Sequence, residues 1–70
     1  MSKEELTPRE TEVLLALIRG LSNKEIADEL SVTHHTIKAH ISSILHKFGC
    51  KNRTDTVLYA IKNEIIRLQD

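Results

Sequence analysis

The sequence predicts an all-α domain of four short helices. Four segments carry apolar residues three or four positions apart, and no segment alternates apolar and polar residues as a half-buried strand does. Each segment follows a residue suited to N-capping, and a glycine follows the first and the third segment. A chain of 70 residues makes one domain. We expect the helices at about residues 8–19, 23–30, 34–48 and 53–62 or longer.

The first two helices begin with the same type of capping signal. Thr7 and Glu10, like Ser22 and Glu25, have the spacing of a capping box, and Pro8 occupies the first helical position. Gly20 is placed to end the first helix in a left-handed conformation. The expected inward residues are Val13, Leu14, Leu17 and Ile18 in the first helix and Ile26, Ala27 and Leu30 in the second. The brief link 31–33 then requires a sharp angle before the third helix.

The third helix, capped by Thr33 and ended by Gly49, separates an apolar face from a face without acids. At about 100° per residue, one face collects Ile37, Ile41, Ile44, Leu45 and Phe48, and the opposite face collects His35, Lys38, Ala39, Ser42 and His46. A solvated face normally mixes both charge signs. A face with one lysine, small residues and no carboxylate is instead suited to close approach to phosphates and base edges.

The fourth helix is expected to start after Asn52, with Asp55 three residues beyond this cap. We expect it to bury Val57, Leu58 and Ile61 and to continue as far as Ile65 or Leu68. Before the first helix, residues 1–5 are polar and form an expected tail or linker remnant, and residues 6–70 form the expected domain.

The charge of the chain is segregated. Its formal net charge is zero, with ten basic and ten acidic residues, which by itself argues against nucleic-acid binding. Residues 31–54, however, hold four Lys or Arg, all four histidines and no acid. This central third can present a positive face to a polyanion.

Other function classes lack their characteristic residues. Cys50 is the single cysteine, so neither an internal disulfide nor a two-cysteine metal clip is possible. The histidines lack the i, i+3 or i, i+4 spacing that chelation from one helix requires, so we expect no metal and no cofactor. There is no catalytic constellation, apolar membrane span or signal peptide, and we expect a cytoplasmic, non-enzymatic protein.

The chain resembles the LuxR/FixJ-type (GerE-like) helix-turn-helix domain of bacterial response regulators. The matching stretches are Leu6–Glu10 with Glu12–Leu14, Gly20–Ala27, Thr36–Lys38, His40, Ile44, Lys47–Phe48, Arg53–Thr54 and Ala60. They extend over about residues 6–66 in a family-like order. The resemblance implies that the second and third helices form the helix-turn-helix, and that the third lies in the major groove of double-stranded DNA.

The resemblance also implies roles for individual residues. Base contacts fall on Lys38, Ala39 and Ser42, to which the exposed His35 is added, and phosphate contacts fall on Asn23, Lys24, Thr33, Thr36 and Lys47, to which His46 is added. The fourth helix would pair two copies on a two-fold site through Thr56, Tyr59, Ala60 and Asn63, which lie off its expected core stripe. An N-terminal receiver domain and RNA polymerase are implied as further partners in a two-component system.

Two alternative functions remain open from the sequence. A helical protein-interaction module without DNA affinity would explain the zero net charge. A promoter-reading region of a σ factor would have similar helix-turn-helix patterning, although the cap at 52–55 fits the response-regulator pattern better.

Overall fold

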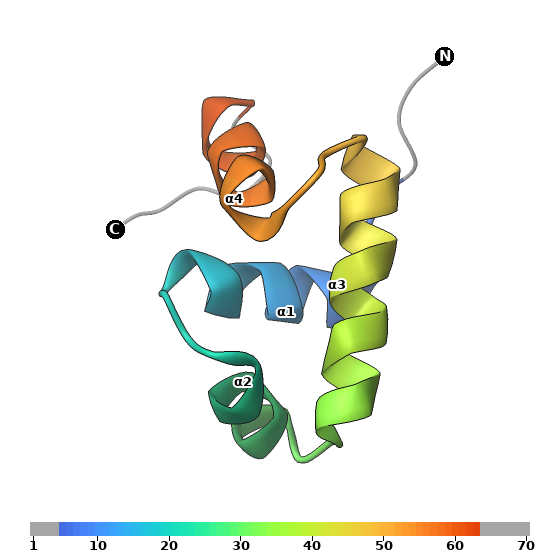
Figure 1. Cartoon of the computed structure of the whole chain (residues 1–70), viewed down its shortest axis with the longest axis vertical. Coiled ribbons are helices and arrows are strands. Elements are labelled where there is room, and N and C mark those ends of the chain that lie inside the picture. Colours follow the sequence, from blue (N-terminus) through green and yellow to red (C-terminus); the bar gives the residue numbers. More distant parts are fainter. Residues whose placement is uncertain (1–4, 64–70) are drawn as a thin grey trace.

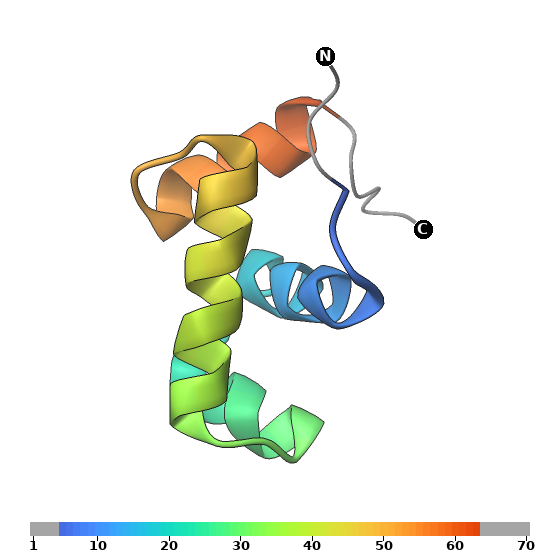
Figure 2. The same ribbon diagram turned by 90° about the vertical axis from the view of Figure 1, so that its right-hand side faces the viewer.

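The computed structural model describes residues 5–63. It contains α1 (Pro8–Ile18), α2 (Asn23–Leu30), α3 (His34–Phe48) and α4 (Arg53–Lys62), which confirms the predicted four-helix, all-α fold. α3 stands along one side of the molecule, with α1 and α2 packed against it and α4 near its C-terminal end (Figures 1 and 2). The expected continuation to Ile65 or Leu68 lies outside the described residues.

The helices begin where the capping residues place them. In α1, the Thr7 hydroxyl accepts from the Glu10 amide at 3.1 Å, and a Glu10 carboxylate oxygen accepts from the Thr7 amide at 2.9 Å. Ser22 and Glu25 repeat this capping box at the start of α2. Each box satisfies two amides that the first turn of a helix leaves unpaired. Local sequence therefore determines these two starts.

A small aliphatic core orients α3. Ile37 and Ile44 have no exposed surface, and Ile41 and Phe48 are also buried, as the apolar stripe predicted. They pack with Val13 and Leu14 of α1 and Ile26 of α2 in one cluster. Truncating a buried isoleucine to alanine typically costs about 2–5 kcal/mol. The core therefore resists rotation of α3 and keeps its opposite face outward.

The turn between α2 and α3 depends on Ser31. This residue ends α2 in the left-handed conformation, at φ 60°, which costs a non-glycine residue about 1–2 kcal/mol. Val32 then packs against the core, and the Thr33 hydroxyl caps α3 by accepting from the Thr36 amide at 3.1 Å. This three-residue reversal completes the helix-turn-helix.

The predicted core face of α4 is wrong for Leu58 and Ile61, whereas Val57 packs against the core as expected. Leu58 and Ile61 are 59% and 41% exposed and Val57 is half-buried, whereas Thr56 and Ala60 are buried. Thr56 and Ala60 are small enough to sit within the domain, and the Thr56 hydroxyl is satisfied by donating to the Asn52 carbonyl at 3.0 Å. The centroid of the Tyr59 ring lies 4.7 Å from the centroid of the Phe48 ring on α3. Leu58 and Ile61 are left facing outward.

The four described helices have 8 to 15 residues each. Between residues 5 and 63, none combines the length and the hydropathy that crossing a bilayer requires.

Candidate nucleic-acid interface

The outer face of α3 is open to solvent. Its members His35, Lys38, Ala39, Ser42 and His46 are all exposed. Lys38 takes part in none of the ion pairs found within residues 5–63, so its ammonium group is available for an external anion. This face therefore combines a free cation with small side chains that let the helix backbone approach another molecule.

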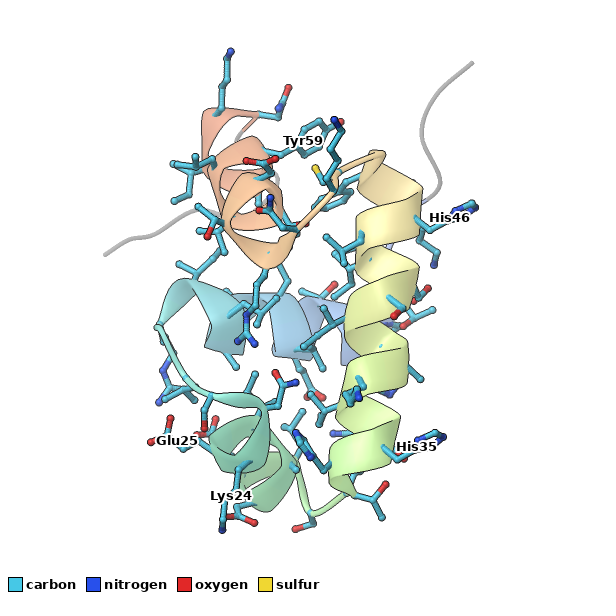
Figure 3. The ribbon with its side chains drawn as sticks, viewed as in Figure 1. Lys24, Glu25, His35, His46 and Tyr59 are labelled. Atoms are coloured by element: carbon cyan, nitrogen blue, oxygen red, sulfur yellow. The ribbon has the colours of Figure 1, made fainter. Side chains whose placement is uncertain are left out.

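The two imidazoles of this face lie near its ends. Figure 3 shows His35 and His46 pointing away from the other helices, on the same side of α3. They are eleven positions apart, or roughly 16 Å along the helix axis. The intervening surface is long enough to face several nucleotides, since successive base pairs of DNA are about 3.4 Å apart.

A buried carboxylate on α1 holds the C-terminal half of α3. Glu10 is 5% exposed, and its carboxylate accepts hydrogen bonds from the Lys47 ammonium at 2.7 Å and from the Ser43 hydroxyl. Burial by itself would raise the pKa of Glu10, but hydrogen bonds from Lys47, Ser43 and the Thr7 amide lower its pKa from 4.5 to about 2. The carboxylate is therefore charged at neutral pH and joins α1 to α3.

This arrangement removes Lys47 from the predicted phosphate contacts. Its side chain is 15% exposed, and its ammonium group also donates to the Glu5 carbonyl at 3.1 Å. A phosphate would have to displace the Glu10 carboxylate and leave that charge buried and unpaired, which is costly. The prediction for Lys47 is thus corrected: its role in the folded domain is internal.

The other predicted phosphate contacts lie around the start of the helix-turn-helix. Lys24 is exposed, with its ammonium 3.6 Å from Asp28, and Asn23 is half-buried. The Thr33 and Thr36 hydroxyls lie 2.9 Å apart at the start of α3. Together with the exposed His46, these residues remain candidates for phosphate contact.

The predicted dimer residues divide into two groups. Thr56 is 1% exposed and Ala60 has no exposed surface, so neither can line an interface while the domain keeps this fold. The prediction for both is wrong because α4 turns them toward its own domain. Asn63 is exposed, and half-buried Tyr59 packs on Phe48. Leu58 and Ile61 are the exposed apolar side chains of α4.

The described residues do not assemble a metal site. Within residues 5–63, no three His, Cys, Asp or Glu side chains come together in an arrangement that could hold a metal ion. Cys50 is half-buried, and its thiol lies 3.8 Å from the Phe48 carbonyl oxygen.

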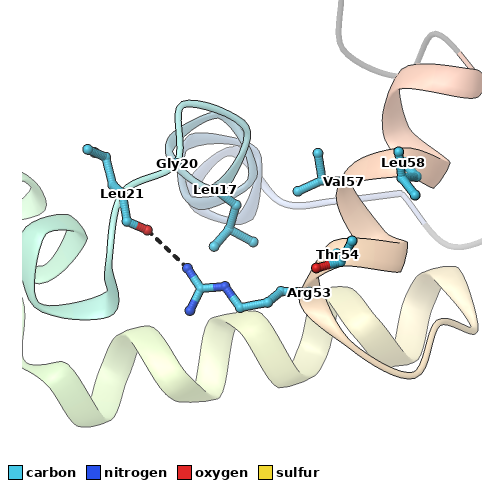
Figure 4. Close-up of a pocket in the computed structure, with 7 residues that line it drawn as sticks. All are labelled: Leu17, Gly20, Leu21, Arg53, Thr54, Val57 and Leu58. Atoms are coloured by element: carbon cyan, nitrogen blue, oxygen red, sulfur yellow. Dashed lines mark hydrogen bonds between the residues drawn. The ribbon is translucent and has the colours of Figure 1, made fainter.

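Two long-range contacts of the domain have no local signal in the sequence. Ser43 and Lys47 are four residues apart on α3, which indicates a shared face, but nothing local identifies Glu10 as their partner. Arg53, the first residue of α4, reaches the segment before α2 and donates to the Leu21 carbonyl at 3.0 Å (Figure 4). It also donates to the Asn23 side-chain oxygen at 2.8 Å.

Comparison with known proteins identifies the family. The sequence profile described as "Bacterial regulatory proteins, luxR family" matches residues 4–60, most of the chain. The chain is 44% identical over 64 residues to the response regulator protein VraR of Staphylococcus aureus. This match covers 91% of the chain and 31% of VraR, so the chain spans about a third of the length of such relatives.

Solved structures agree with this assignment. The response regulator ChrA of a heme-sensing two-component system superposes with a TM-score of 0.86 at 35% identity, covering 94% of this chain and 33% of ChrA. The DNA-binding domain of the response regulator ComA, solved in complex with the anti-activator RapF, gives a TM-score of 0.78 at 39% identity. That match covers 80% of this chain and 97% of the ComA domain. The chain therefore belongs to the LuxR family of bacterial regulatory proteins and is a helix-turn-helix DNA-binding domain of that family.

Proposed function

We propose that this domain binds double-stranded DNA sequence-specifically, with α3 in the major groove. The observation that carries the proposal is the exposed face formed by His35, Lys38, Ala39 and Ser42, which lacks carboxylates while the opposite face of α3 is buried. α3 has 15 residues and is therefore about 22 Å long. A major groove about 12 Å wide accepts such a helix.

Each residue of this face matches a feature of base edges. Lys38 can donate to the O6 and N7 atoms of guanine, Ala39 can contact a thymine methyl group, and Ser42 can donate or accept. His35 lies toward the start of the helix, where recognition helices commonly contact bases. Asn23, Lys24, Thr33, Thr36 and His46 would contact phosphates and set the register without reading sequence.

The first experiment is a salt titration with a matched substitution. A duplex selected from a random pool by the unmodified domain is bound at several salt concentrations, and affinity is expected to fall steeply as salt rises. Lys38→Ala should cost about 1–3 kcal/mol and relax the preference at one base position. Arg9→Ala, which removes a cation paired with Glu12 on α1, is the control and should bind nearly normally. Equal loss by Lys38→Ala on every sequence would show that Lys38 contacts only phosphate.

A second part of the proposal is that two copies bind a two-fold site through α4. Leu58 and Ile61 support this part, because they lie three residues apart on one helix face and expose apolar surface. Asn63 and the edge of Tyr59 complete the proposed contact. Two recognition helices would then be spaced about one turn of DNA apart, or about 34 Å.

The parent protein would connect this domain to a signal. We propose that a receiver domain accompanies residues 6–70, with 1–5 as the connecting segment, and that the domain acts beside RNA polymerase in the cytoplasm. The support is that VraR and ChrA are response regulators of which this chain covers about a third.

A protein partner is the second candidate. The zero net charge and the complex of the homologous ComA domain with an anti-activator favour it. An interaction module without DNA affinity would show no salt-sensitive gel shift, so the same titration separates the two functions.

A further inference from the structure

Arg53 carries a charge that no carboxylate neutralises in the described part of the chain. This side chain is half-buried, and the two groups to which it donates hydrogen bonds are neutral oxygens, the Leu21 carbonyl and the Asn23 amide oxygen. None of the four ion pairs found within residues 5–63 includes it. Partial burial of a cation costs free energy unless it is paired or serves a bound anion. The position of Arg53 thus indicates a role beyond packing.

The contact with Arg53 determines which way the Asn23 amide points. Arginine has donors and no acceptor, so the Asn23 atom that faces it must be the oxygen. The amide nitrogen, with its two N–H groups, is turned away from Arg53. No acceptor for this nitrogen is found among residues 5–63, and no side-chain polar atom there is buried without a partner. The nitrogen is therefore open to solvent and free to donate.

Asn23 and Arg53 line one hollow together with Lys38 and Ser42, which belong to the outer face of α3. Its volume is about 280 Å³, and it joins the starts of α2 and α4 to the middle of α3. An isoleucine and a leucine form its apolar part, and the polar groups around it are an ammonium, a guanidinium, an amide and a hydroxyl. The lining residues are Asn23, Lys38, Ile41, Ser42, Leu45 and Arg53. Donors and cations without a carboxylate select an anionic oxygen as ligand.

We propose that Arg53 is a positioning residue for DNA binding. By occupying the Asn23 oxygen and the Leu21 carbonyl, it directs the Asn23 nitrogen to donate to a phosphate oxygen of the DNA strand at this hollow. Lys38 and Ser42 then reach the adjacent bases. The fork of the guanidinium is required, because it serves two oxygens in a fixed geometry that a single lysine ammonium does not reproduce. This inference rests on the proposed DNA-binding function.

Asn23→Asp separates positioning from folding. The aspartate keeps an oxygen for Arg53 and converts the hydrogen bond into an ion pair, and a negative charge in the first turn of α2 is favourable. Thermal stability should therefore be unchanged or higher. The second carboxylate oxygen would replace the N–H donors and repel phosphate, so affinity for the selected duplex should fall tenfold or more.

A matched control corrects for the added charge. Asn52→Asp places one negative charge at the cap of α4, where aspartate and asparagine serve equally well. It lies outside the hollow, so its loss of affinity should be less than about threefold at physiological salt. An equal loss in Asn52→Asp and Asn23→Asp would overturn the inference, because it would show a general charge effect.

Arg53→Lys and Asn23→Ala then test whether Arg53 acts on DNA binding through Asn23. Each should weaken binding about tenfold, the contribution of one hydrogen bond to a charged group, and the double variant should bind no worse than either single variant. Wild-type affinity in Arg53→Lys would show that charge alone suffices, and wild-type affinity in Asn23→Ala would show that no phosphate contact exists. Either result overturns the inference while leaving DNA binding intact. If the unmodified domain binds no duplex, the proposed function itself fails.

Discussion

The link between α1 and α3 through Glu10 should make the stability of the domain fall in acid. The pKa of Glu10 is about 2 in the folded domain, against 4.5 for an ordinary glutamate. A carboxyl group whose pKa is lowered on folding stabilises the folded state above its unfolded pKa. Its contribution is fully present above about pH 4.5 and is lost as the pH falls toward 2.

The size of this contribution follows from the same two values. The two pKa values, 4.5 and about 2, differ by an amount that corresponds to roughly 3 kcal/mol, because one unit of pKa is worth about 1.36 kcal/mol. Some screening by solvent at the Lys47 end of the pair lowers the expected value to about 2 kcal/mol. A domain of this length typically has only about 4–10 kcal/mol of stability in total. Losing this contribution should therefore be easy to measure.

Urea unfolding followed by circular dichroism, repeated across acidic and neutral pH, measures the effect. Glu10→Gln should be less stable than the unmodified domain at neutral pH by about 2–4 kcal/mol, because it also leaves the Lys47 ammonium without its counterion. The difference should shrink as the pH falls toward 2. Glu12→Gln, an exposed carboxylate on the same helix, is the control and should change stability by less than about 1 kcal/mol.

A double variant distinguishes loss of the ion pair from general damage to the fold. Lys47→Met combined with Glu10→Gln removes both charges, and the double variant should be more stable than the sum of the two single losses predicts. A constant difference between Glu10→Gln and the unmodified domain from neutral pH to pH 2 would refute the reasoning. That result would mean that the hydrogen bonds from Lys47, Ser43 and Thr7 do not stabilise the charged carboxylate of Glu10 in the folded domain.

A further prediction concerns DNA binding. Leu58→Glu should leave the fold intact, because this side chain is 59% exposed, and should abolish cooperative binding to a two-half-site duplex in a gel shift while affinity for a single half-site is kept. Unchanged cooperativity in Leu58→Glu would exclude this face of α4 from the dimer.

Most of the fold could be predicted because its signals are local. The boxes at Thr7 and Ser22 and the glycine at position 49 mark helix ends through contacts within three or four residues. The outer face of α3 could be predicted for a similar reason, because α3 carries one continuous apolar stripe and the side opposite that stripe must be exposed. Ser31 was missed as a left-handed residue because only glycine or asparagine normally signals that conformation.

The packing of α4 could not be predicted in the same way. Val57, Leu58 and Ile61 form the more apolar stripe, which hydrophobicity alone assigns to the core. The domain instead buries Thr56 and Ala60, and size and a local hydrogen bond, rather than hydrophobicity, make that face suitable. The contacts of Glu10 with Lys47 and of Arg53 with Asn23 join residues 37 and 30 positions apart. No local pattern relates such pairs.

The placement of α3 against DNA is tested most directly by nuclear magnetic resonance. A selected duplex is titrated into the isotope-labelled domain, and the backbone amide shifts are mapped onto the helices. The largest changes should fall on His35, Lys38, Ala39 and Ser42 and at the start of α2, with little change on the outer side of α1. Shifts concentrated at Glu12 and Leu15 of α1, with the α3 amides unmoved, would contradict the claim that this carboxylate-free face contacts the bases.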